Sequence, residues 1–133
     1  SVKEQATKLL VPGTLWKEYH KEVGHIMTSE LLGLGLIDKA DVKNENPDWP
    51  AYKKYFMHGT SHHMGLDTHD YGLLWEPMQA NMVFTVEPGI YIPEEGFGIR
   101  LEDDVVIQQT GAPFNLMKNI PILADEIEDL MNS

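Results

Sequence analysis

Acidic side chains stand inside two strand-like apolar runs, and this feature most limits how the chain can fold. The first run is Val83-Phe-Thr-Val-Glu87-Pro-Gly, and the second begins Gly98-Ile-Arg100-Leu-Glu102. A carboxylate inside an apolar strand is costly unless a positive group stands beside it. We therefore expect the two runs to meet where a basic side chain or a cation reaches both glutamates.

Four of the six histidines lie close together ahead of these runs. His58 and His62 are four residues apart, as in a helical zinc site, but the Gly-Thr-Ser between them disfavours a helix. On an extended segment the side chains alternate, so His58 and His62 share one face and His63 takes the other. A pair of hydrogen-bonded structural histidines is the alternative to a functional pair.

The same alternation orients the side chains of both runs. Glu87 points away from the face of Phe84 and Val86, which is predicted to lie in the core, and Arg100 shares a face with Glu102. As an alternative, Arg100 and Glu102 form a structural ion pair, and the acidic residues that follow are a solvated strand end, as is common in sheets. These following residues are Asp103 and Asp104.

Two glutamates and a histidine on one face would repel and lose hydration unless a divalent cation held them. The chain has no cysteine, so any metal must be bound by His, Asp and Glu. Ligands of this kind favour manganese, cobalt or iron over a structural zinc, and two ions that share carboxylates would suit a bridging hydroxide.

The flanking segments have the periodicities of helices and strands. Helices are predicted over residues 1–10, 14–34 and 124–132, with Thr14 and Asp125 as N-caps. Strands are predicted over residues 82–92, 97–107 and 114–117, with a turn at residues 93–96. A polar connection over residues 38–50 is expected to hold only short helical turns. His20 and His25 have charged neighbours and are predicted to be solvated.

Composition narrows the class of protein. The 133 residues, 42% hydrophobic and 23% charged, fit a single globular domain. A net charge of −11 argues against nucleic acid or an anionic membrane as a partner, and it is compatible with cationic ligands. The lack of cysteines and of a signal-peptide pattern predicts a cytoplasmic location.

Three motifs in this order resemble one enzyme family. The chain is similar to the catalytic half of the aminopeptidase P and prolidase group of pita-bread metallopeptidases, family M24, and closer to aminopeptidase P. The similarity extends into the C-terminal residues 119–131 and so covers nearly the whole chain. The motifs are His58-Gly-Thr-Ser-His62-His63-Met-Gly-Leu-Asp-Thr-His69-Asp70, Met82-Val-Phe-Thr-Val-Glu87-Pro-Gly-Ile-Tyr91 and Gly98-Ile-Arg100-Leu-Glu102-Asp103-Asp104.

The resemblance implies an α+β fold, the C-terminal half of a pita-bread domain, with a mainly antiparallel sheet flanked by helices. It implies removal of the N-terminal residue from peptides with proline in second position, by a hydroxide that bridges two divalent metal ions. The expected ions are Mn²⁺, with cobalt or zinc as alternatives, and a peptide is the expected substrate. A prolidase-type dipeptidase and a non-enzymatic peptide-binding module on the same fold are the alternative functions.

Roles for individual residues also follow from the resemblance. His62, Glu87 and Glu102 would bind metal, with Glu87 also acting on the hydroxide and Glu102 bridging the ions. The remaining residues would act on the substrate or hold the ligands in place: His58 and His69 would line the substrate pocket, and Arg100 and Tyr91 would support the ligands and relay protons.

The chain departs from the family in one respect. The family's metal centre also uses two aspartates and a further histidine from an earlier half of the fold. The aspartates before His58 lie in the turn-rich connection and are not read as substitutes. Residues 1–133 are therefore expected to be the C-terminal half of a catalytic domain, inactive alone and partnered by the N-terminal half. The sheet face meant for that half should be apolar, which would allow a homo-oligomer.

Overall fold

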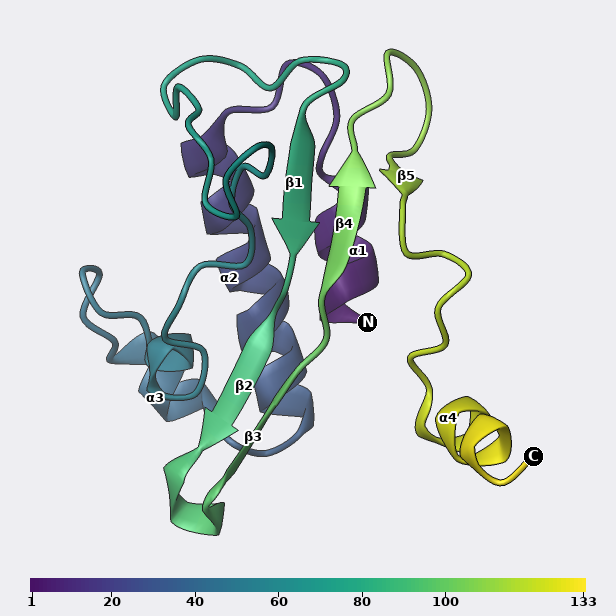
Figure 1. The fold of residues 1–133 in the computed structure, drawn as a ribbon. Coiled ribbons are helices and arrows are strands. Elements are labelled where there is room, and N and C mark those ends of the chain that lie inside the picture. Colours follow the sequence, from purple (N-terminus) through teal and green to yellow (C-terminus); the bar gives the residue numbers. More distant parts are fainter.

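An antiparallel ribbon with two arms organises the computed structural model, which describes residues 1–133. One arm is β1 (Val83–Val86) followed in line by β2 (Gly89–Ile92); the other is β3 (Phe97–Arg100) followed by β4 (Asp103–Val106) (Figure 1). β1 pairs with β4, and β2 pairs with β3. The two predicted strands are confirmed in position, but each is interrupted for two residues near its middle.

The two interruptions lie opposite each other because both ladders have the same register. The pairs that border the gap are Val86 with Asp103 and Gly89 with Arg100. Continued through the gap, this register would put Glu87 directly opposite Glu102, next to Pro88. Like charges directly opposite are destabilising, and proline has no N–H to donate. The ladder therefore opens at the level where the two glutamates stand.

A tight turn and a short third strand complete the sheet. The 3₁₀ turn η2 (Pro93–Glu95) joins β2 to β3 and ends at Gly96, whose φ of 68° lies in the left-handed region that glycine adopts at no steric cost. β5 (Phe114–Asn115) pairs with β4 and is shorter than the predicted strand over residues 114–117.

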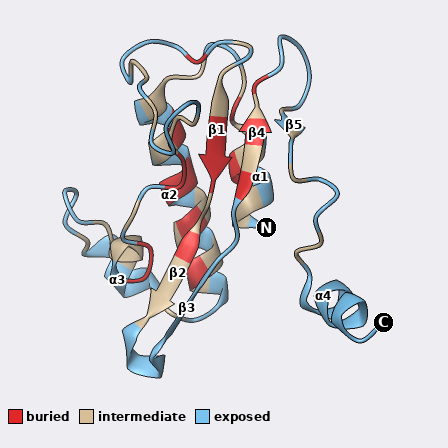
Figure 2. Cartoon of the chain, in the orientation of Figure 1, coloured by how far each residue is buried: buried red, intermediate tan, exposed pale blue.

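Helices α1 (Val2–Lys8) and α2 (Trp16–Gly33) pack against one side of β1 and β4 (Figures 1 and 2). The buried side chains of α2 recur every three or four residues, which gives the helix one apolar stripe. That stripe packs against buried residues of the sheet region, and each buried side chain contributes roughly 1.5–3 kcal/mol to the stability of the fold by leaving water. The side chains in this contact are Tyr19, Val23, Met27 and Leu31 from α2, and Phe84, Val86, Val105 and Ile107 from the sheet region.

Both predicted N-caps are wrong by one or two residues. Leu15 is the N-cap of α2, and the Thr14 hydroxyl instead donates to the Leu9 carbonyl, where it closes the turn after α1. Leu123 is the N-cap of α4 (Ala124–Met131), and Asp125 lies in its first turn, where a carboxylate still favours the helix dipole.

Two short helices lie in the connection between α2 and the sheet. α3 (Lys39–Lys43) begins with a capping box between Asp38 and Asp41, and the 3₁₀ helix η1 (Ala51–Lys54) follows. The prediction of short turns alone is thus confirmed. Because Asp38 and Asp41 cap a helix, their carboxylates are directed to backbone N–H groups.

The C-terminal segment stands apart from the body of the molecule. α4 has no buried residue, and Figure 1 shows it separated from the sheet. A groove of about 720 Å³ runs between this segment and the side of the molecule formed by α1, β4 and β5. No helix of the chain is both long and apolar enough to span a bilayer.

Candidate metal centre

Residues 58–64 are held along β1, on the edge opposite β4. Their backbone bonds form an antiparallel series: Met64 N donates to Val83 O at 3.1 Å, Thr85 N to His62 O at 3.0 Å, and Glu87 N to Thr60 O at 2.7 Å. In this register, even-numbered residues of the segment share a face with odd-numbered residues of β1. The predicted extended conformation of the histidine segment is therefore confirmed.

Two hydrogen bonds position His62. Its backbone N–H donates to the Thr85 hydroxyl at 3.1 Å, and its ring Nδ1 lies 2.9 Å from the His63 carbonyl oxygen. A carbonyl oxygen only accepts hydrogen bonds, so Nδ1 carries the hydrogen in this contact. In the neutral ring Nε2 then presents a lone pair, which is the form of imidazole that binds metals.

Glu87 meets that lone pair. Its Oε1 lies 2.9 Å from Nε2 of His62 and accepts from the Thr85 hydroxyl at 3.2 Å. Its Oε2 lies 3.5 Å from Arg100 Nη1. Two acceptors 2.9 Å apart repel unless a proton or a cation lies between them, so this contact is incomplete when His62 is neutral.

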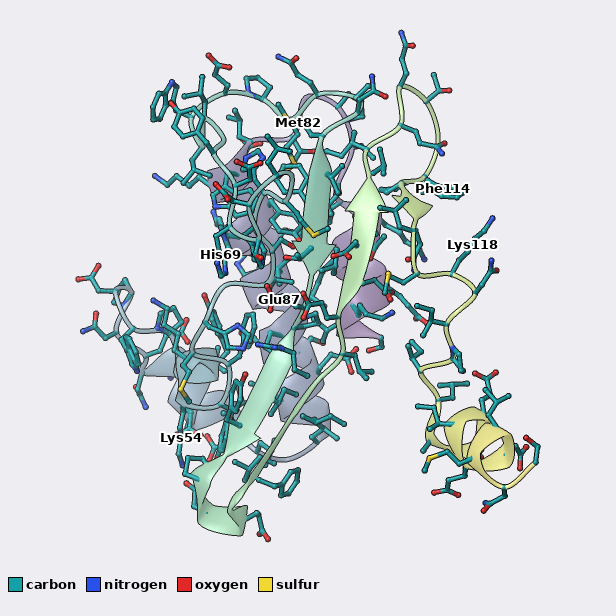
Figure 3. The ribbon with its side chains drawn as sticks, viewed as in Figure 1. Lys54, His69, Met82, Glu87, Phe114 and Lys118 are labelled. Atoms are coloured by element: carbon teal, nitrogen blue, oxygen red, sulfur yellow. The ribbon has the colours of Figure 1, made fainter.

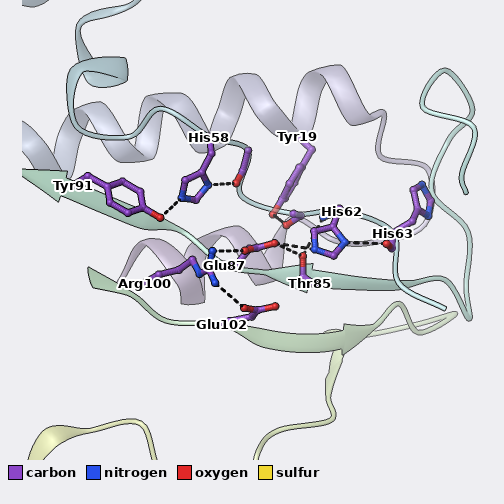
Figure 4. A network of polar contacts seen from close by, with 11 residues as sticks. Tyr19, His58, His62, His63, Thr85, Glu87, Tyr91, Arg100 and Glu102 are labelled. Atoms are coloured by element: carbon purple, nitrogen blue, oxygen red, sulfur yellow. Dashed lines mark hydrogen bonds and ion pairs between the residues drawn. The ribbon is translucent and has the colours of Figure 1, made fainter. Parts of the chain in front are cut away.

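Glu102 completes the cluster from the other arm of the ribbon (Figure 4). One ligand atom from each of His62, Glu87 and Glu102 lies within 4.8 Å of the others, and no other group of three potential ligands in the chain does so. Arg100 bridges the two carboxylates, with Nη2 lying 3.8 Å from Glu102 Oε2. The ion pair considered from the sequence is thus present, but it is long and half-exposed.

The donor set fits a divalent cation. One arginine at 3.5 and 3.8 Å provides weak compensation for two carboxylates that face each other across an open ladder. One imidazole and two carboxylates, without sulfur, are ligands suited to Mn²⁺, Co²⁺ or Zn²⁺. Glu87 and His62, on the segment paired with β1, would contact such an ion from one side, and Glu102 would contact it from the other arm.

His58 and Tyr91 form a separate pair beside this cluster. The Nδ1 of His58 contacts the Gly59 carbonyl at 2.7 Å, so Nε2 of the neutral ring accepts from the Tyr91 hydroxyl at 2.9 Å. A cavity of about 320 Å³ lies on the other side of His58, where Tyr52 and Phe56 contribute aromatic walls. His58 therefore lies between Tyr91 on β2 and the aromatic hollow.

His69 lies on an exposed loop and reaches back over the cluster. Its ring centroid is 4.3 Å from that of His62, and Figure 3 shows it near Glu87. The loop is closed by Asp70, whose N–H donates to the His63 carbonyl at 3.0 Å and whose side chain accepts from the N–H of Tyr71 at 2.7 Å. Backbone donors of this kind lower the pKa of the Asp70 carboxyl.

Comparison with known proteins assigns the chain to a family. Residues 1–109 match the model of metallopeptidase family M24. The chain belongs to this family. It is 43% identical to the Xaa-Pro aminopeptidase of Escherichia coli, over 96% of the chain and 31% of that relative. It is 38% identical to the Xaa-Pro aminopeptidase of Haemophilus influenzae, over 97% of the chain and 32% of that relative.

Solved structures match this M24 chain equally well. Aminopeptidase PepP of Pseudomonas aeruginosa superimposes with a TM-score of 0.81 at 33% identity, over 98% of the chain and 32% of that protein. The zinc-substituted aminopeptidase P of E. coli, in complex with product, gives a TM-score of 0.80 at 39% identity, with the same shares. The predicted α+β fold is confirmed, and it matches the C-terminal portion of the aminopeptidase P fold. The chain spans about a third of the length of the relatives it matches.

One histidine of the M24 chain is not where the sequence suggested. His20 was predicted to be solvated, but it is half-buried, packs edge-on to Trp16 with ring centroids 4.8 Å apart, and lines the hollow beside His58. Burial lowers the pKa of its imidazole. The prediction considered the charged residues Glu18, Lys21 and Glu22 nearby in the sequence, but the contact that buries His20 is with Trp16, one helical turn before it. His25 is exposed, as predicted.

Sequence reasoning missed three polar supports. Thr85 joins His62 to Glu87, and the buried Tyr19 hydroxyl lies 2.7 Å from Ser61 Oγ, which ties α2 to the histidine segment. Burial raises the pKa of Tyr19 to about 12, with a smaller opposing effect of the Ser61 hydrogen bond. The place of Thr85 two residues before Glu87 was the only signal, because Tyr19 and Ser61 are far apart in the sequence.

Proposed function

We propose that His62, Glu87 and Glu102 are metal ligands of an Xaa-Pro aminopeptidase. The observation that carries the proposal is the convergence of their ligand atoms within 4.8 Å at an opening in the sheet. Membership of family M24 and similarity to two bacterial Xaa-Pro aminopeptidases support it. The substrate would be a peptide with proline in second position, from which the first residue is released.

The complete centre would hold two divalent ions, with Mn²⁺ proposed first and Co²⁺ or Zn²⁺ as alternatives. The E. coli relative has been solved with zinc substituted and, separately, with the inhibitor Pro-Leu. When bound, such ions lower the pKa of water and polarise a peptide carbonyl. We propose Glu102, which reaches in from the other arm of the ribbon, as the ligand that would be shared between the two ions.

The chain's own residues would prepare this site. The His63 carbonyl fixes the tautomer of His62 that presents Nε2, and Thr85 holds Glu87 Oε1 toward it. Arg100, 3.5 Å from Glu87 and 3.8 Å from Glu102, would help to orient both carboxylates and to position Glu87 to accept a proton from water. The contacts of His62 and Glu87 would set their ligand geometry in advance, which metal ligands require.

Substrate contacts are proposed for the remaining histidines. His69, exposed above His62, would orient the peptide or donate to its scissile carbonyl oxygen. His58, beside the aromatic hollow, would contact the proline side of the cleavage point, with Tyr91 fixing its ring and available to relay a proton.

We further propose that residues 1–133 supply one half of a catalytic domain and that the other half supplies further carboxylate ligands. Three protein ligands do not fix a two-metal centre, and the aspartates upstream of His58 do not join the cluster. The chain by itself is then expected to bind metal weakly and to lack peptidase activity. The N-terminal half of the enzyme would be its partner.

Calorimetry and an activity assay on the same samples test both proposals. Mn²⁺ is titrated into the chain and into a His62→Ala/Glu87→Ala variant, and hydrolysis of an Xaa-Pro peptide is followed. Weak binding that the variant loses, without hydrolysis, supports half of a metal centre. Unchanged binding in the variant would contradict the ligand assignment. Turnover near that of a complete enzyme would contradict the need for a second half.

A further inference from the structure

Asp103 is the only buried charged residue in the chain, and it directly follows the proposed ligand Glu102. Its side chain is 5% exposed, against 43% for that of Glu102. Successive residues of a strand point to opposite faces, so the Asp103 carboxylate lies on the far side of the sheet from the metal cluster.

Two elements from distant parts of the sequence meet this carboxylate. Lys3 of α1 donates to Asp103 Oδ2 through Nζ, and Asn115 of β5 donates to the same oxygen at 2.9 Å. The Lys3 side chain is itself largely buried, at 13% exposure. A buried ion pair of this kind cannot lose one partner without stranding the other charge. Asp103, Lys3 and Asn115 are called the latch below.

The position of the latch matters because Asp103 borders the gap in the ladder. Asp103 pairs with Val86, the residue before Glu87, at the point where regular pairing resumes. On the other side of the gap, every residue of β3 is exposed. The backbone of Glu102 is therefore fixed mainly from the Asp103 side, while its own carboxylate has only Arg100 at 3.8 Å.

We propose that Asp103 is a positioning residue for Glu102, held in turn by Lys3 and Asn115. The latch would fix the backbone from which Glu102 projects, so that its carboxylate meets the ions bound by His62 and Glu87. This role rests on the metal site proposed above, but it concerns a group on the opposite face that touches neither metal nor substrate.

A purely structural role for the latch predicts something different. If Lys3 and Asp103 only dock α1 on the sheet, breaking the pair lowers the stability of the whole chain and leaves the local order at Glu102 unchanged. The discriminating quantity is therefore the backbone order parameter of Glu102, compared with those of His62 and Glu87, in chains that are still folded.

NMR of the isotopically labelled chain tests the proposal by comparing the wild type with the variant Lys3→Met. The matched control is Lys8→Met, at an exposed position of the same helix, and Lys3→Arg is the conservative variant. In Lys3→Met the Glu102 order parameter should fall from about 0.85 to below roughly 0.6, while His62 and Glu87 stay rigid. Lys8→Met should resemble the wild type, and Lys3→Arg should restore most of the order.

Added Zn²⁺, the diamagnetic ion among those proposed, gives a second, metal-dependent measure. It should shift the side-chain signals of His62, Glu87 and Glu102 in the wild type, and lose its effect on Glu102 alone in Lys3→Met. If it shifts none of the three in the wild type, the metal proposal fails, and the order parameters still decide the role of Asp103. Should Lys3→Met not fold, Asp103→Asn, which keeps shape and the contact to Asn115, replaces it. Order at Glu102 that is unchanged, or lost equally across the sheet, overturns the proposal.

Discussion

Glu87 and Glu102 stand at facing positions of one ribbon, yet the structure holds them very differently. Glu87 is 13% exposed and is contacted by Thr85, His62 and Arg100, and its own N–H donates to Thr60. Glu102 is 43% exposed and has one long contact to Arg100. The side of the candidate centre that holds Glu87 is therefore preformed. The position of the Glu102 carboxylate depends on groups that have yet to bind it.

The strands that precede the two glutamates, β1 and β3, differ in the same way. In β1 three of four residues are buried, whereas β3 is exposed throughout, with Phe97 and Ile99 more than half exposed. Burial immobilises a strand because each buried side chain contacts many neighbours. β1 and the histidine segment paired with it, together called the rigid side below, thus supply Glu87 and His62, whereas β3 leaves apolar surface and Glu102 accessible to a second body.

The largest expected effect compares one phenylalanine from each arm. Phe84→Ala removes a fully buried ring from the contact with α2 and should lower the free energy of unfolding by about 3–5 kcal/mol. Phe97→Ala removes a ring that is 56% exposed and should cost about 0.5 kcal/mol or less. Urea unfolding of both variants measures this difference. Similar losses would mean that the two arms are equally packed.

The next effect concerns the ligands themselves. Glu87→Ala should weaken Mn²⁺ binding by roughly 100-fold, because it removes a preoriented carboxylate and leaves Arg100 beside the site. Glu102→Ala should cost roughly tenfold, because its carboxylate must be ordered on binding. Glu95→Ala, on the exposed turn, is the charge control. Calorimetry gives the three affinities, and a larger loss for Glu102 than for Glu87 would reverse the comparison.

A smaller effect tests how the rigid side is supported. Tyr19→Phe deletes the hydroxyl that lies 2.7 Å from Ser61 Oγ and should destabilise the chain by about 1 kcal/mol, because Ser61 is left buried without this partner. Tyr71→Phe, at an 82% exposed position, should change little. Thermal unfolding measures both. Equal melting temperatures for the two variants would show that α2 does not anchor the histidine segment through this bond.

Much of the rigid side could be predicted from the sequence. Alternation placed Phe84 and Val86 in the core and Glu87 on the opposite face, and the extended conformation of the histidine segment followed from its poor helix formers. These features are local, since each depends on the residue types within a few positions along the chain.

The run of β3 and β4 could be predicted less well because its contacts join distant residues. The acidic pair after Glu102 was offered as a solvated strand end, but Asp103 is buried against Lys3, about a hundred positions away in the chain. The break in both strands also depends on pairing, since Pro88 and the two facing glutamates interrupt the ladder only once the arms are side by side. Periodicity within one run carries no information on either contact.

The smallest expected effect is a pH dependence at the edge of the rigid side. Burial against Trp16 lowers the pKa of His20 below its ordinary value of 6.5, so the unfolded chain binds a proton more readily than the folded chain. Stability from this group is therefore fully present above pH 6.5 and is lost as the pH falls through the folded-state pKa. The loss should be roughly a few tenths of a kcal/mol, because His20 is only half-buried.

His20→Gln isolates this contribution, with His25→Gln as the control at an exposed position of the same helix. Urea unfolding at several pH values between 7 and 5 should show a shallower acid loss for His20→Gln than for the wild type, and an unchanged loss for His25→Gln. His63, whose pKa burial also lowers, remains in both variants and keeps part of the acid sensitivity. If the two variants respond to acid alike, the hollow beside His58 is open enough to solvate His20. Trp16 would then be the last tightly packed residue at this edge of the rigid side.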